Sequence, residues 1–83
     1  MNTRQELCKL LDQALGLDGR AQSFDTDTPL MGALPELDSM GVVAILTALE
    51  DRLGIAVDDD EIDASVFETF GSLWSFVENK LAS

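Results

Sequence analysis

A serine between an acidic and an apolar residue is the side chain in this sequence best placed to accept a covalent group. Asp38, Ser39 and Met40 stand where a region rich in Gly, Asp, Thr, Ser and Pro gives way to apolar residues at helical spacing. A serine at a helix N-terminus is exposed, and the unpaired backbone N–H groups there favour an attached phosphate. By local sequence alone, the simpler interpretation is a plain helix cap followed by a polar residue.

The composition excludes most small-enzyme chemistry. The chain has no histidine and no tyrosine, which removes Ser-His-Asp and Cys-His catalysis and histidine-ligated metals. Its one cysteine, Cys8, stands between Leu7 and Lys9 in an amphipathic segment with no base to activate it. A chain of 83 residues also buries too little surface for a large enclosed active site. We therefore expect a single domain spanning residues 1–83 that is not an enzyme.

The acidic residues do not match a metal site. Asp25, Asp27 and Glu36 occupy the first, third and twelfth positions of a hypothetical calcium loop. Its sixth position is Leu30, where such a loop needs glycine for a sharp turn. The run Asp58–Glu61 cannot form a closed oxygen cage from adjacent side chains. We expect no metal ion.

Apolar periodicity predicts an all-α fold, a small bundle of four helices of which one is short. The first helix is expected from Gln5 to Leu15, with Thr3 and Glu6 as a capping box and Gly16 as a left-handed stop. The apolar stripe of this helix consists of Leu7, Leu10, Leu11, Ala14 and Leu15.

Three further helices are expected after a long loop. Asp38 is an N-cap residue type ahead of a second helix over residues 39–53. One or two short helical turns are expected within residues 58–67. The last helix is expected to begin near Phe70, capped by Thr69.

The long loop lies between the first and second helices, over residues 17–37, where no helical or strand period is sustained. A loop of this length must be held by scattered apolar residues that dock on the core. The candidates are Phe24, Leu30, Met31, Leu34 and Leu37.

The charge balance restricts the partners. Five basic and sixteen acidic residues give a net charge of −11, which repels nucleic acid and anionic lipid and attracts basic protein surfaces. No apolar run approaches the length of a membrane span. The single cysteine is compatible with a reducing compartment. We expect a cytoplasmic monomer that binds no nucleic acid and does not insert into membranes.

The segment Leu34–Met40, followed by Ala48–Ile55, resembles the acyl carrier protein family, in which Asp-Ser-Leu or Asp-Ser-Met before a helix marks the attachment site. The order of the expected elements resembles that family over the whole chain. The resemblance implies a 4'-phosphopantetheine arm linked to the Ser39 hydroxyl, whose thiol holds an acyl group as a thioester. It also implies that Asp38 caps the helix and contributes to recognition by a phosphopantetheinyl transferase.

The resemblance further implies a docking surface for partner enzymes with basic patches, namely an acyl-activating ligase or synthase and acyltransferases. The residues assigned to this surface are Met40, Val43, Glu50, Asp51, Asp59, Asp60 and Glu61. An acyl chain could fold back between the second and last helices, where Leu46, Phe76 and Val77 could line a cavity.

The sequence departs from the family pattern at three positions. Glu36 stands where a small residue is usual, and Gly41 and Ala44 replace common polar or acidic residues, which indicates a specialised carrier. The segments Pro35–Met40 and Val57–Ile62 are similar to those of carriers associated with bacterial exosortase systems. The alternative, from a different class, is an acidic helical interaction domain that never receives a prosthetic group.

Overall fold

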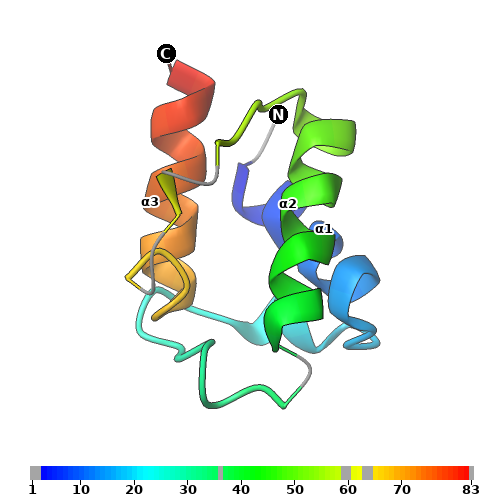
Figure 1. Ribbon diagram of the computed structural model, residues 1–83. Helices are drawn as coiled ribbons and strands as arrows, with labels where there is room; N and C mark the ends of the chain where they lie inside the picture. Colours follow the sequence, from blue (N-terminus) through cyan, green and yellow to red (C-terminus); the bar gives the residue numbers. More distant parts are fainter. Residues whose placement is uncertain (1–2, 36, 59–60, 63–64, 83) are drawn as a thin grey trace.

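Three α-helices and one 3-10 helix form the regular structure of the described chain in this computed structural model, which describes residues 3–35, 37–58, 61–62 and 65–82 (Figure 1). The helices are α1 (Thr3–Leu15), η1 (Arg20–Ser23), α2 (Ser39–Leu53) and α3 (Phe70–Ala82). α1 contacts each of the other three. The all-α fold expected from the sequence is confirmed. None of the described helices is both long and apolar enough to cross a membrane.

The hydrophobic core forms around one stripe of α1. Leu7, Leu10 and Leu11 are fully buried, as their spacing of three and four residues requires on a helix. Full burial of a leucine side chain contributes about 1.5–3 kcal/mol. The core is completed by Cys8, Leu15, Leu17, Ala21, Phe24, Leu30, Leu37, Ile45, Leu49, Ile55, Phe67, Phe70, Leu73 and Val77.

α1 begins two residues earlier than expected. Thr3 is the first residue of α1, so its predicted role as the cap ahead of the helix is wrong. The predicted end is confirmed, because Gly16 follows Leu15 with a left-handed φ of 67°. That conformation costs a residue with a side chain about 1–2 kcal/mol. Beyond the turn, the Leu17 N–H donates to the Asp12 carbonyl at 3.0 Å.

α2 spans the residues predicted for it. It runs from Ser39 to Leu53, and Gly54 ends it with a φ of 67° while its N–H donates to the Glu50 carbonyl at 3.1 Å. Both ends of α2 are therefore determined by residues within one turn, Asp38 at the start and Gly54 at the end.

The long loop contains the 3-10 helix η1, which sequence periodicity did not predict. Side chains of α1 hold this part of the loop. An Asp12 carboxylate oxygen accepts a hydrogen bond from the Ala21 N–H at 2.9 Å, and the Arg4 guanidinium donates to the carbonyl oxygen of Phe24 at 2.9 Å. η1 thus depends on contacts with a distant segment, which a local pattern cannot reveal.

The next part of the loop pairs with the backbone that leads into α3. The Leu30 N–H donates to the Glu68 carbonyl at 3.0 Å, and the Phe70 N–H donates to the Thr28 carbonyl at 2.8 Å. Pro29 and Thr69 form an isolated antiparallel bridge. The loop before α2 and the start of α3 are therefore joined by main-chain hydrogen bonds.

Four of the five expected loop anchors pack on the core. Phe24, Leu30 and Leu37 are buried, and Leu34 is partly buried against the core. The prediction is wrong for Met31, which is 42% exposed. Met31 lies in a turn that begins at Leu30, whose carbonyl accepts from the N–H groups of Ala33 and Leu34, and this turn carries the Met31 side chain to the surface.

The expected short helix falls partly outside the described residues, which omit 59–60 and 63–64. In the described part of residues 58–67, Glu61 has 3-10 conformation, with its N–H donating to the Asp58 carbonyl at 3.0 Å, residues 65–67 form a turn, and none is α-helical. α3 follows with its predicted first residue and cap. The Thr69 hydroxyl oxygen accepts from the Ser72 N–H, and the Ser72 hydroxyl oxygen accepts from the Thr69 N–H, both at 3.1 Å. This reciprocal pair forms a capping box.

Candidate functional site

Ser39 is the first residue of α2, and its side chain is exposed. The buried Leu37 anchors the chain two residues earlier, so the loop reaches the helix from a defined point on the core. The first intrahelical bond of α2 runs from the Val42 N–H to the Asp38 carbonyl at 2.9 Å, which leaves the N–H groups of Ser39 and Met40 ahead of it. An exposed hydroxyl beside first-turn N–H groups suits a phosphodiester.

Asp38 holds the start of α2 as predicted. Its backbone is extended, and its carboxylate accepts a hydrogen bond from the Gly41 N–H at 2.9 Å. The carboxylate also lies at the positive end of the helix dipole. Asp38 is exposed. Another protein can therefore approach its carboxylate while one oxygen keeps the hydrogen bond from the Gly41 N–H.

The predicted docking residues on α2 are all exposed. Met40 is 76% exposed and Val43 is 57% exposed, and their separation of three residues places them on one face of the helix. Glu50 and Asp51 are exposed near the other end of α2. At 1.5 Å per residue, Glu50 lies about 16 Å along the helix from Ser39. The apolar pair and the acidic pair therefore lie on separate parts of the α2 surface.

Among the predicted docking residues that the structure describes, Glu61 is the acid whose charge is paired within the chain. Its carboxylate accepts a hydrogen bond from the Lys80 ammonium at 2.6 Å and from the Asp58 N–H at 2.9 Å. The bond from Lys80, more than the bond from Asp58, lowers the pKa of Glu61. The neighbouring docking candidates, Asp59 and Asp60, lie outside the described residues.

Cys8 is buried in the core, and burial raises the pKa of its thiol. A neutral thiol inside a core is inert. Within the described ranges, no three His, Cys, Asp or Glu side chains gather in a way that could hold a metal ion.

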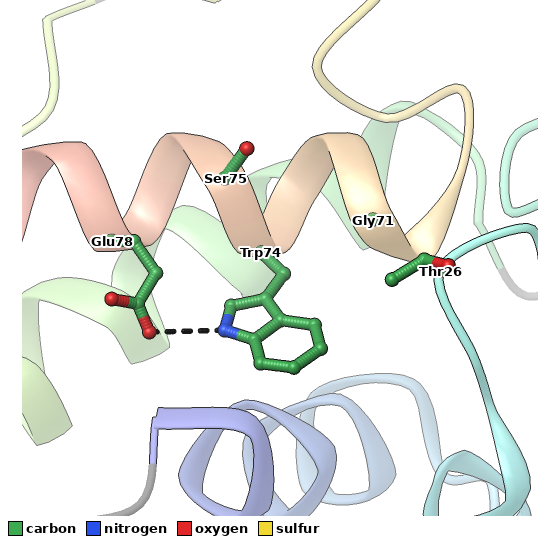
Figure 2. Close-up of a pocket in the computed structure, with 5 residues that line it drawn as sticks. All are labelled: Thr26, Gly71, Trp74, Ser75 and Glu78. Carbon is green, nitrogen blue, oxygen red and sulfur yellow. Dashed lines mark hydrogen bonds between the residues drawn. The ribbon is translucent and has the colours of Figure 1, made fainter.

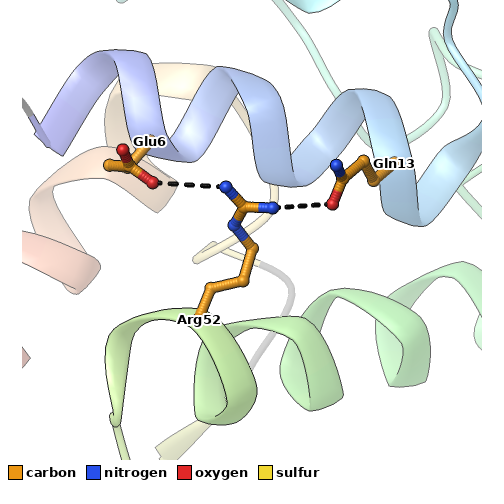
Figure 3. Close-up of polar contacts among 3 residues, drawn as sticks. All are labelled: Glu6, Gln13 and Arg52. Carbon is orange, nitrogen blue, oxygen red and sulfur yellow. Dashed lines mark hydrogen bonds and ion pairs between the residues drawn. The ribbon is translucent and has the colours of Figure 1, made fainter.

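An arginine bridge between α1 and α2 was not identified from the sequence. The Arg52 guanidinium donates to the Gln13 side-chain oxygen at 2.7 Å and to the Glu6 carboxylate at 3.4 Å (Figure 3). Gln13 and Glu6 are seven residues apart, two turns along one face of α1. That spacing is the only local signal, and it does not indicate the partner on α2.

Surface hollows lie away from the candidate attachment residue. One is lined by Thr26, Gly71, Trp74, Ser75 and Glu78 (Figure 2). Two others lie beyond the end of α2 and share the lining residues Gly54, Ile55 and Ala56. The residues predicted to line an acyl cavity do not line any of these three. Val77 is buried, and Leu46 and Phe76 pack partly buried against the core.

Comparisons with known proteins agree with this geometry. Residues 5–76 match the family model described as "Phosphopantetheine attachment site", a range that includes Asp38 and Ser39. A solution NMR structure of a holo acyl carrier protein from Nitrosomonas europaea has a TM-score of 0.88 and 44% sequence identity, and the alignment covers 100% of both chains. No curated protein matches the chain significantly.

The all-α fold, the exposed serine at the capped start of α2 and the family model together define a phosphopantetheine-bearing carrier domain. Within that class, the chain belongs to the acyl carrier protein family. The prosthetic group of this family is 4'-phosphopantetheine, attached covalently. The family assignment made from the sequence is confirmed.

Proposed function

We propose that Ser39 carries the 4'-phosphopantetheine arm and that the chain delivers acyl groups to partner enzymes as thioesters. The observation that supports this most directly is the exposed serine at the first position of α2, preceded by the capping residue Asp38. A phosphopantetheinyl transferase would supply the catalytic groups. The Ser39 oxygen would form a bond to the phosphorus of coenzyme A nearest the pantetheine, the bond to the nucleotide part would break, and the hydroxyl proton would pass to the transferase.

The chain's own contribution is positioning. The capped helix end holds the attachment oxygen on a rigid element, and the tethered thiol reaches each docked enzyme at a high effective concentration. Docking would use Met40 and Val43 for apolar contact and the acids Glu50 and Asp51 for attraction to basic surfaces. The partners we propose are an acyl-activating ligase or synthase and acyltransferases.

Glu61 is expected to contribute less to docking than Glu50 or Asp51, because a partner's basic residue would compete with Lys80 for the Glu61 carboxylate.

We propose that the chain has no catalytic activity of its own and acts as a monomeric single domain. The cytoplasmic location and the similarity to exosortase-associated carriers stay predictions.

Co-expression with a broad-specificity phosphopantetheinyl transferase, followed by intact-mass measurement, tests the attachment. The wild-type chain is expected to gain the mass of one phosphopantetheine group, and Ser39→Ala is expected to gain none. Ser75→Ala is the matched control, because this serine is exposed on α3 and its loss leaves the expected modification intact. An unmodified wild-type chain would favour the acidic interaction domain instead.

A further inference from the structure

A shallow hollow of about 270 Å³ lies along α3, away from the start of α2. Four of its lining residues repeat along one stripe of α3, and the fifth comes from the long loop (Figure 2). They are Gly71, Trp74, Ser75, Glu78 and Thr26. A pocket for a whole small-molecule ligand usually measures about 300–1,000 Å³. The hollow lies just below that range and is open to solvent, so its size is compatible with one side chain of another protein.

Two side chains give the hollow its chemistry. The indole N–H of Trp74 donates to a carboxylate oxygen of Glu78 at 3.0 Å (Figure 2). The Trp74 ring also packs against the Phe70 ring in a tilted arrangement, with ring centroids 5.9 Å apart. These contacts hold the indole in place, and they set a carboxylate at its edge.

An aromatic face beside a carboxylate recognises a cation. The ring attracts positive charge through its quadrupole, and an arginine guanidinium can stack on it while its N–H groups reach a carboxylate. A lysine ammonium is a more strongly hydrated point charge and lacks the flat shape. None of the five lining residues is basic, and the chain's net charge of −11 favours binding of a cationic side chain.

We propose that this hollow is a second docking point, which receives an arginine side chain from a partner protein. It lies on α3, whereas the proposed attachment residue and the proposed docking residues Met40 and Val43 lie on α2. The proposal does not depend on phosphopantetheine, so it can succeed or fail independently of the proposed function.

The test uses the full chain and the peptide acetyl-Gly-Arg-Gly-amide at about the physiological ionic strength of 0.15 M. Trp74 is the only tryptophan, so intrinsic fluorescence reports directly on the hollow. Two-dimensional NMR follows the Trp74 indole N–H and the Gly71 amide at the same time. Both readouts are expected to change in a saturable way. The matched peptide with citrulline, which keeps the shape and loses the charge, is expected to cause no saturable change.

Glu78→Gln is expected to weaken binding of the arginine peptide about threefold to fivefold, as for loss of one exposed charge pair. Asp18→Asn removes the same charge from an exposed position outside the hollow and is expected to leave binding unchanged. An equal response to citrulline, an equal loss with Asp18→Asn, or NMR changes confined to α2 would each overturn the proposal. The citrulline comparison needs no variant, so it decides the question even if a substitution disturbs folding.

Discussion

The carboxylate of Asp38 accepts a hydrogen bond from the backbone N–H of Gly41 at 2.9 Å. The Asp38 carbonyl also accepts the first intrahelical bond, from Val42. One residue thus satisfies two donors of the first turn and sets the direction in which Ser39 leaves the loop. Stability and modification are both expected to depend on Asp38, and they can be separated by substitution.

Asp38→Ala is expected to lower the free energy of unfolding by about 1 kcal/mol, because the Gly41 N–H loses its acceptor. Asp38→Asn keeps an acceptor and is expected to retain most of that stability. Urea unfolding measures both. If Asp38→Asn is stable but poorly modified, the charge acts in transferase recognition as well as in capping. Equal stability of Asp38→Ala and the wild type would show that the cap is unimportant.

Gly71 is expected to tolerate no side chain. A Cβ atom there would lie 2.6 Å from the Thr26 carbonyl oxygen, which also accepts the Gly71 N–H at 3.1 Å. The clashing Thr26 oxygen belongs to the backbone and cannot move without disturbing the loop. Gly71→Ala is therefore expected to lower the free energy of unfolding by about 1–3 kcal/mol. Ser75→Ala, at an exposed position one turn along α3, is the control and is expected to shift the urea midpoint little.

Loss of the Arg52 bridge is expected to have a small, salt-dependent effect. Arg52→Met keeps the aliphatic stem and removes the contacts to Gln13 and Glu6. Because the pair with Glu6 is partly exposed, the loss is expected to be about 0.2–1 kcal/mol at low salt and less at high salt. Thermal unfolding at two ionic strengths measures it. A loss that grows with salt would contradict the ionic origin.

Stability is expected to fall with acidification partly through Glu61. Lys80 lowers the pKa of Glu61 in the folded chain below its ordinary value of 4.5. The pair's stabilisation is therefore present above pH 4.5 and is lost as the pH falls through the lowered folded pKa. Urea midpoints at pH 7 and at pH 3 are expected to differ less in Glu61→Gln than in the wild type. Identical pH dependence in the two chains would rule out a contribution from the pair.

The Cys8 thiol is expected to react slowly in the folded chain. It is fully buried, and burial raises its pKa, so both access and thiolate content are low. A thiol reagent at pH 8 is expected to label the chain at the rate set by unfolding, and Asp38→Ala is expected to raise that rate. Rapid labelling of the native chain at the rate of a free cysteine would show that α1 opens locally.

Local features of the site could be predicted from the sequence because they depend on residues within one or two turns. Asp38 as the cap, Ser39 as the first helical residue, Gly54 as the stop and Thr69 as the cap of α3 are of this kind. The apolar periods placed the three α-helices for the same reason. The start of α1 at Thr3 lies two residues before the predicted start, because helix ends are defined only to within one or two residues.

Tertiary structure decided which side chains from distant segments meet. The 3-10 helix η1 depends on Asp12 of α1, and the turn that exposes Met31 is held by a hydrogen bond from the Met31 N–H to the carbonyl of the distant Phe67. The Arg52 bridge and the hollow beside Trp74 each join residues from elements far apart in the chain. Such contacts depend on how the packed helices are placed in space, whereas the position of the proposed attachment serine required only a helix beginning at residue 39.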